Sequence, residues 1–209
     1  MIVVIDYGVG NTSSVLNMLK KIGATAKLSA DPAEIRKAER LILPGVGAFD
    51  KGITALRERR LEPILREQVL DVRKPILGIC LGMQLLARSS EEGELPGLGW
   101  IEAETRRFCF REPATTYRVP HMGWNWVKPH GADSLFDGFQ NPPRFYFVHS
   151  YHVVCDDAND VLATTEYGND FVCAVRRANI FGTQFHPEKS HRFGMHLLKN
   201  FLQWESVSC

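Results

Sequence analysis

The stretch KPILGICLGMQLL, from Lys74 to Leu86, predicts a buried strand that runs directly into a helix. The apolar run Pro75–Ile79 is typical of a buried strand, and the residues after it continue with helical spacing. Cys80 lies at the change of element, between Gly78 and Gly82. Glycines at these positions remove the side chains that would crowd a tight turn. The stretch therefore predicts a sharp bend with a cysteine at its apex.

The chain before and around this bend alternates short β-rich runs with helical patterns, as in a parallel sheet covered by helices. Strands are predicted at Ile2–Asp6 and Arg40–Leu43, before the one at Pro75–Ile79. A helix is predicted over residues 15–22, with Gly23 following where a C-terminal glycine belongs.

A second early helix is predicted to begin in DPAEI. Asp31 would cap it, Pro32 would take its first position, and Glu34 would complete a capping box with Asp31.

From about Trp100 to Ile180 the pattern changes to short β-type runs separated by turn residues. These runs are YRV, WNWV, RFYFVHSYHVV, VLATTEY and FVCAVRR. They predict an antiparallel section attached to the parallel sheet. A last helix is predicted over Ser190–Glu205, with one apolar stripe made of Phe193, Leu197, Leu198, Phe201 and Trp204. The expected fold is α/β: a single flavodoxin-like, three-layer domain over residues 1–209, with a mostly parallel central sheet and an antiparallel β section.

Composition limits the function classes. The chain has 209 residues, 44% of them hydrophobic, which suits one well-buried domain. Its formal net charge is only +1, so bulk electrostatics favour neither nucleic acid nor an anionic membrane as partner. No CxxC pair or metal-ligand spacing occurs, so we expect no metal and no cofactor.

The expected location is the cytoplasm. The five cysteines are odd in number and widely spaced, which suits a reducing compartment: Cys80, Cys109, Cys155, Cys173 and Cys209. The opening MIVVIDYG lacks the basic region of a signal peptide, and no apolar run reaches about 18 residues.

Cys80 is the first candidate for chemistry. Its surroundings resemble the Gly-x-nucleophile-x-Gly elbow of α/β hydrolases, and a helix N-terminus favours the thiolate, the reactive form of cysteine. The alternative is that Cys80 is a small apolar residue packed in the core, since cysteine is often buried and inert. A partner base would decide between the two.

The segment FGTQFHPEKS, from Phe181 to Ser190, offers that base. IFGTQF is predicted to be a strand, and His186 and Glu188 are two residues apart, so an extended backbone would direct both side chains to one face. A carboxylate there can hold one imidazole nitrogen and leave the other for a thiol proton. The alternative is a structural histidine near a strand end.

Together, GICLGMQ and FHPEKS resemble the class I glutamine amidotransferases over nearly the whole chain. The resemblance implies that Cys80 attacks the side-chain amide of glutamine, that His186 is general base and then acid, and that Glu188 orients it. The tetrahedral oxyanion would be held by the N–H of Leu81. A second donor would come from LPGVGAF, where Val46 and Gly47 follow a strand that ends at the same sheet edge.

The motifs DYGVGN, LPGVGAF, GICLGMQ, PHMGWN, YFVHSYH and GTQFHPEKS further resemble the glutaminase subunits of imidazole glycerol phosphate synthases, which act in histidine biosynthesis. The resemblance implies a separate (β/α)8 cyclase subunit as heterodimer partner and ammonia acceptor. It also implies that glutamine is bound by Gln84, Glu92, Ser150 and Tyr151, and that the partner interface and ammonia exit include Asn11, Trp124, Tyr146 and Lys189.

Two alternatives stay open at this point. GNTSSVLNMLKKIG and SSEEGELPGLGWIEAETRRF also resemble a paralogous branch that feeds sugar amidotransferases of surface-polysaccharide biosynthesis. A more remote alternative is a non-catalytic flavodoxin-like module whose cysteine is structural or redox-sensing.

Overall fold

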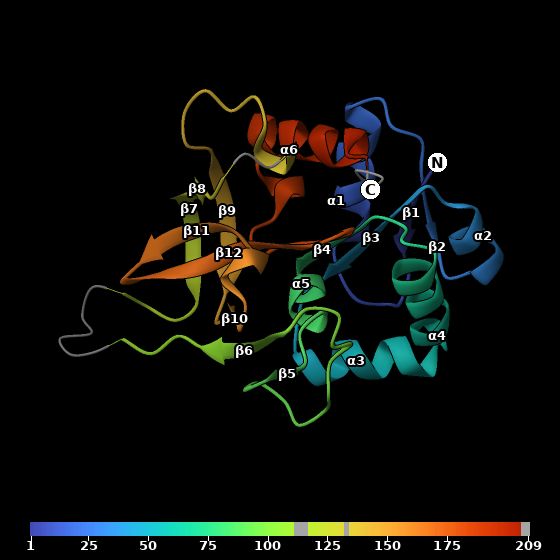
Figure 1. Cartoon of the computed structure of the whole chain (residues 1–209), viewed down its shortest axis with the longest axis horizontal. Helices are drawn as coiled ribbons and strands as arrows, with labels where there is room; N and C mark the ends of the chain where they lie inside the picture. Colours follow the sequence, from blue (N-terminus) through green and yellow to red (C-terminus); the bar gives the residue numbers. More distant parts are fainter. Residues whose placement is uncertain (111–116, 132–133, 206–209) are drawn as a thin grey trace.

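The computed structural model describes residues 1–110, 117–131 and 134–205 (Figure 1). The strands are β1 (Ile2–Ile5), β2 (Ala26–Ser29), β3 (Arg40–Gly45), β4 (Ile76–Cys80), β5 (Ser89–Ser90), β6 (Ala103–Arg107), β7 (His121–Trp126), β8 (Lys128–Pro129), β9 (Arg144–His149), β10 (Tyr151–Cys155), β11 (Val161–Tyr167), β12 (Asn169–Arg177) and β13 (Ile180–Thr183). The α-helices are α1 (Thr12–Lys21), α2 (Pro32–Lys37), α3 (Phe49–Glu58), α4 (Leu61–Arg66), α5 (Leu81–Leu85) and α6 (His191–Gln203). A π-helical turn follows α4 (Glu67–Asp71), and 3₁₀ turns lie at Ser134–Phe136, Ala158–Asp160 and Pro187–Lys189.

The main sheet has the strand order β2-β1-β3-β4-β13-β12-β10-β6-β5. Neighbours from β2 through β13 are parallel, whereas β12 pairs antiparallel with β13, β10 and β11. A separate antiparallel pair, β7 with β9, lies beside the antiparallel half. The expected α/β fold, with a parallel sheet and an attached antiparallel section, is confirmed.

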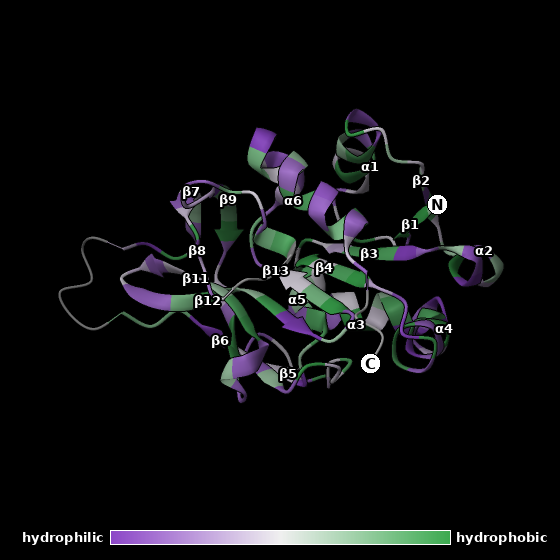
Figure 2. Cartoon of the chain, turned by 45° about the horizontal axis from the view of Figure 1, so that its top comes forward, coloured by the Kyte–Doolittle hydropathy of each residue, from purple (hydrophilic) through white to green (hydrophobic). Residues whose placement is uncertain are grey.

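Helices cover both faces of the parallel half. In Figure 1, α1 and α6 lie on one side of the sheet, and α3, α4 and α5 lie on the other. Alternate strand residues face the two layers: Val3 packs with the α3–α4 layer and Val4 with the α1–α6 layer. The central strands are hydrophobic throughout because neither face meets water, and Figure 2 shows this in the green of β4 and β13. This is the predicted three-layer arrangement.

Two local predictions were wrong. Tyr117–Val119 form no strand: β7 begins at His121, after Pro120, which has no N–H for a ladder. The capping box at α2 is incomplete, because Glu34 pairs with Lys27 while Ser29 Oγ accepts the Asp31 N–H at 3.0 Å. Asp31 does cap α2, as predicted, by accepting the N–H of Ala33 at 2.9 Å.

The bend at the end of β4 is packed without spare room. A Cβ on Gly82 would lie 1.8 Å from the carbonyl oxygen of Leu43, at the end of β3. A Cβ on Gly78 would lie 2.7 Å from the carbonyl of Gly82. Glycine is therefore required at both positions because backbone approaches backbone there.

A cluster of aromatic rings joins the β7–β9 pair to the main sheet. His121 and His149 lie within it, 3% and 6% exposed, with His121 Nδ1 and His149 Nε2 3.1 Å apart. The His121 ring stacks on Phe147 and Tyr167, with centroids 4.8 Å and 4.0 Å away. Burial lowers the pKa of His121 to about 4 and also lowers that of His149, so both are neutral at pH 7.

Cys80, Cys109, Cys155 and Cys173 are free thiols, and Cys209 lies outside the described residues. Within the described ranges, no helix has the length and apolar character needed to cross a bilayer.

We expect Gly82→Ala to destabilise the protein by at least about 3 kcal/mol, because the new methyl group displaces the Leu43 carbonyl. Gly23→Ala is the matched control: Gly23 has φ +81° but no atom within 4 Å of the added Cβ. Its cost should be about 1 kcal/mol, from the left-handed backbone alone. Urea unfolding measures both, and equal losses would contradict the packing argument.

We expect the free energy of unfolding to fall as the pH drops from 6.5 toward 4. The folded-state pKa of His121 is depressed, so its contribution is complete above the unfolded value of 6.5 and is lost as the pH falls through the folded value of about 4. The loss from His121 is on the order of 3 kcal/mol.

Denaturant titrations at several pH values measure this slope. His121→Gln should flatten it, whereas a substitution at the exposed His130, His130→Gln, should leave it as in the wild type. An unchanged slope in His121→Gln would refute the assignment.

Candidate active site

Cys80 is the apex of a strained turn. It is the last residue of β4 and the residue before α5, with φ 54° and ψ −110°, a backbone conformation that non-glycine residues rarely adopt. Its Cα pairs with that of Gly45 at the end of β3, so the loop that follows β3 emerges next to the thiol. The predicted bend is confirmed.

His186 and Glu188 form a buried pair. Nδ1 of His186 lies 2.7 Å from Oε1 of Glu188, and the two side chains are 1% and 3% exposed. Burial lowers the pKa of His186, but interaction with Cys80 and Glu188 outweighs it and raises that pKa to about 9. His186 is therefore an imidazolium at neutral pH, next to both the thiol and the carboxylate.

The pair forms differently from the sequence-based expectation. β13 ends at Thr183, and Pro187–Lys189 is a 3₁₀ turn capped by His186, so an extended strand does not align the two side chains. Instead, the turn folds Glu188 back onto the ring of His186. Pro187 at the first position of the turn ends the extended backbone, which the strand prediction overlooked.

Ser190, which was not predicted, fixes this turn. Its Oγ donates to the carbonyl of His186 at 2.6 Å and accepts the N–H of Tyr146 at 3.0 Å. The N–H of His186 in turn donates to the carbonyl of Tyr146 at 2.9 Å. The histidine is thereby tied to β9.

Cys80 opens into a pocket of about 440 Å³. Its lining includes all the residues predicted for the oxyanion and for glutamine, together with Cys80 itself and four others: Val46, Gly47, Ala48, Cys80, Leu81, Gln84, Glu92, Pro120, Val148, His149, Ser150 and Tyr151. His186 and Glu188 are not part of the lining. The structure thus brings the predicted ligand-binding residues together on one side of the thiol.

The loop after β3 is held at its beginning and open at its tip. The hydroxyl of Tyr7 donates to the carbonyl of Pro44 at 2.7 Å, and burial, followed by the charge of Cys80, raises the pKa of Tyr7 well above its usual range. At the tip, Gly47 has φ +106°, a Cβ added to it would meet no atom within 4 Å, and Val46 is 41% exposed. The peptide between them therefore has room to rotate.

Two of the predicted glutamine-binding side chains also make internal hydrogen bonds. Glu92 Oε2 accepts the N–H of Phe49 at 2.9 Å and so caps α3. Gln84 Nε2 donates to the carbonyl of Tyr151 at 3.1 Å and to Gln184 Oε1 at 3.0 Å. Gln184, which was not predicted, is fully buried. A polar residue inside the apolar run IFGTQF was the signal that could have indicated it.

Three of the four predicted interface residues form one partly exposed cluster. Trp124 and Tyr146 are cross-strand partners on β7 and β9, with ring centroids 6.3 Å apart. Lys189 Nζ lies 5.7 Å from the centre of the Tyr146 ring. The fourth, Asn11, caps α1 with its side chain by accepting the N–H of Ser14 at 3.4 Å.

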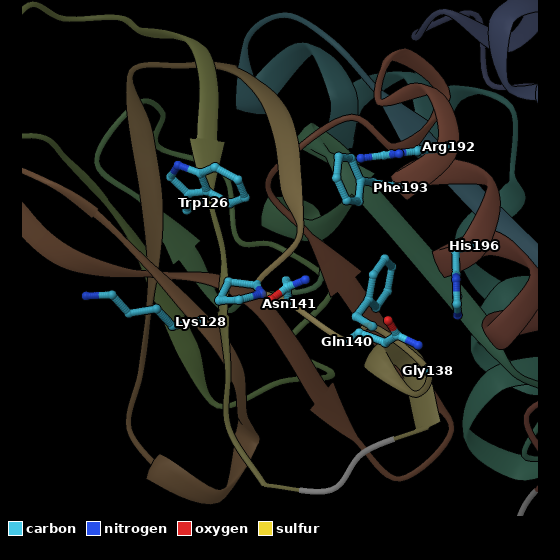
Figure 3. A pocket seen from close by; sticks show the side chains of 10 residues that line it. Trp126, Lys128, Gly138, Gln140, Asn141, Arg192, Phe193 and His196 are labelled. Atoms are coloured by element: carbon cyan, nitrogen blue, oxygen red, sulfur yellow. The ribbon is translucent and has the colours of Figure 1, made fainter.

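A larger hollow of about 870 Å³ lies beside this cluster (Figure 3). Trp126 of β7 borders it on one side, and Arg192, Phe193 and His196 of α6 border it on the other. Its lining includes none of the site residues predicted from the sequence, Cys80 among them.

Comparison with known proteins agrees with this geometry. The model of the family "Glutamine amidotransferase class-I" matches residues 3–204. The chain is 55% identical to imidazole glycerol phosphate synthase subunit HisH 2 of Pseudomonas aeruginosa and 53% identical to the protein of the same name in Methanococcus maripaludis; each alignment covers 97% of this chain and 99% of the relative.

A crystal structure of a glutamine amidotransferase, 22% identical, has a TM-score of 0.75 and covers 97% of this chain and 98% of its own. At that identity the likeness concerns the fold alone. The family match over almost the full length, together with the two close relatives, places this chain in the class I glutamine amidotransferase family.

Proposed function

We propose that the chain is the glutaminase subunit of an imidazole glycerol phosphate synthase and hydrolyses L-glutamine to glutamate and ammonia through a thioester on Cys80. The observation that carries the proposal is Cys80 itself: a thiol at φ 54° that interacts with His186 of the His186–Glu188 pair and lines the 440 Å³ pocket. The names of the two close relatives support the assignment to histidine biosynthesis.

In the first half of the reaction, the Cys80 sulfur attacks the side-chain carbonyl carbon of glutamine. The attacking species is the thiolate, because the thiol is a poor nucleophile, and His186, whose pKa is raised to about 9, carries the proton. When the tetrahedral intermediate collapses, the carbon–nitrogen bond breaks and His186 gives its proton to the leaving nitrogen. Ammonia and a γ-glutamyl thioester result.

In the second half, water attacks the thioester carbonyl. His186, now neutral, takes a proton from the water and becomes imidazolium again, the carbon–sulfur bond breaks, and glutamate leaves. Glu188 holds Nδ1 of His186 throughout and stabilises the imidazolium, so Nε2 stays directed to the reacting atoms.

Both tetrahedral intermediates carry an oxyanion that needs fixed N–H donors. The N–H of Leu81 is one proposed donor, and a peptide N–H of the loop, at Val46 or Gly47, is the second. The open backbone at Gly47 supports a gate: while the second donor points away, the rate falls on the order of 10² to 10³ fold. Docking of a partner would rotate the peptide, so the isolated chain should be a weak glutaminase.

Glutamine itself would lie along the pocket, with Gln84 and Glu92 near its amino-acid end and the backbone of Ser150 and Tyr151 at its α-carboxylate. A carboxylate only accepts hydrogen bonds, so only the N–H groups of this backbone can bind it, whereas the Tyr151 carbonyl accepts from Gln84 and from His149 Nδ1.

The proposed acceptor of ammonia is a (β/α)8 cyclase subunit that docks as a heterodimer partner, in the cytoplasm. The cluster of Trp124, Tyr146 and Lys189 supports a docking face, because Trp124 is 38% exposed and Trp126 and Met122 on the same side of β7 are 53% and 61% exposed. Tyr146 also carries both backbone hydrogen bonds that hold the His186 turn. Binding of a partner to this face could therefore shift His186 through the hydrogen bonds of Tyr146.

Cys80→Ser should reduce glutamine hydrolysis by roughly 10³-fold or more, measured as glutamate release with the cyclase and a cyclase ligand present. Cys109→Ser is the control, since Cys109 is an exposed free thiol outside the pocket and its loss should leave the rate unchanged. A fully active Cys80→Ser variant would sink the thioester mechanism.

Trp124→Ala should weaken binding of the cyclase by 10- to 100-fold, about 2 kcal/mol, as truncation of a central interface tryptophan does. Val72→Ala is matched to it, because Val72 is 58% exposed but follows α4, away from β7. Calorimetric titration of the cyclase measures both. If the two variants bind the cyclase with equal affinity, the proposed docking face is wrong. If the chain binds a sugar amidotransferase and not the cyclase, that enzyme is the acceptor of ammonia.

A further inference from the structure

Gln184 connects the nucleophile to the pocket. It lies after β13 and two residues before His186, and none of its surface is exposed. Its Nε2 donates to the Cys80 sulfur at 3.6 Å, and its Oε1 accepts from Gln84 Nε2 at 3.0 Å. A buried amide that contacts the reacting atom on one side and a pocket residue on the other has a possible role beyond packing.

The orientation of this amide follows from its neighbours. The Tyr151 carbonyl can only accept, so Gln84 must direct its NH₂ group toward it, at 3.1 Å. The same NH₂ group is the one that faces Gln184, so the atom of Gln184 that receives it must be the oxygen. Gln184 therefore directs its own NH₂ group at Cys80, and the reverse assignment would place two donors against each other.

We propose that Gln184 is a positioning residue that holds Cys80 as a thiolate and aims it at the substrate. A hydrogen bond from a neutral amide to a sulfur is worth more when the sulfur is negatively charged, so the donor favours the thiolate over the thiol. Burial makes the donor more effective, because no water competes for it.

The same donor acts twice in the proposed reaction. Before attack it raises the thiolate population of Cys80, and when water cleaves the thioester it stabilises the sulfur as leaving group. Gln184 does not line the pocket, so its loss should lower kcat more than it raises KM. The role of Gln184 in catalysis rests on the proposed glutaminase function. The stabilisation of the Cys80 thiolate by Gln184 does not depend on that function.

Alkylation of Cys80 by iodoacetamide, a small neutral reagent, tests the thiolate without glutamine or cyclase. The full-length protein is labelled at pH 6 to 9 and the modified peptides are quantified by mass spectrometry. The exposed thiol of Cys109 is an internal reference, because its rate should not depend on residue 184.

Two variants separate the donor from packing. Gln184→Met keeps the length of the side chain without a donor, and at pH 7 it should slow alkylation of Cys80 about tenfold relative to Cys109. Gln184→Glu keeps the shape, can still accept from Gln84, and places a carboxylate against the sulfur, so it should slow alkylation further. All three profiles should converge at high pH, where every thiol is ionised.

The inference is overturned if Cys80 alkylates at the wild-type rate in both variants, even if their KM for glutamine rises, because Gln184 would then only support Gln84. If Gln184→Met does not fold, Gln184→Leu replaces it, because leucine also lacks a donor and adds no charge; slower labelling with retained near-ultraviolet circular dichroism then supports the donor. The two proposals can fail separately. If the wild type shows no glutaminase activity but alkylates faster than Gln184→Met and Gln184→Glu, the proposed function is refuted and the inference about Gln184 stands.

Discussion

The site depends on one steric contact, the approach of Gly82 to the carbonyl of Leu43. At this point α5 crosses the end of β3 so closely that a single methyl group would not fit. The contact fixes how sharply β4 turns into α5, and thus the positive φ of Cys80. It also places the thiol beside the loop at Pro44–Gly47. Nucleophile and proposed oxyanion donors are therefore set by the same piece of packing.

A second constraint is the burial of charge. An imidazolium and a carboxylate that are almost inaccessible to water are stable only when they meet each other with good geometry, because each would be costly to bury alone. Ser190 and the backbone of Tyr146 provide that geometry. The proposed catalytic base is consequently attached to β9, which pairs with β7, the strand that carries the exposed tryptophans. The proposed chemistry and the proposed docking surface therefore share the β7–β9 pair, through which partner binding would act on His186.

The polar side chains around the thiol form a series of hydrogen bonds in which the donor and the acceptor of each bond are fixed. Gln84 donates to Tyr151 and to Gln184, and Gln184 donates to Cys80. His149 and His121 continue the series beyond Tyr151, in a cluster that burial keeps neutral. Because each member is already committed to a partner, the amides and rings cannot turn over without breaking a second bond. This pre-organisation suits a site that must present a donor to sulfur and still leave N–H groups for substrate.

Local patterns in the sequence were enough for the alternation of strands and helices and for the elbow at Cys80, since apolar periodicity and flanking glycines act over a few residues. The predicted glutamine-binding residues came instead from the family resemblance. Two predictions from local patterns were wrong. Glu34 does not complete the capping box because it pairs with Lys27, and a 3₁₀ turn, not an extended strand, brings Glu188 to His186. A polar residue within an apolar run could have indicated Gln184, but the roles of Gln184 and Ser190 depend on hydrogen bonds to residues 44 to 104 positions away in the chain. No spacing rule encodes which way a buried amide faces; the neighbours that folding brings to it decide that.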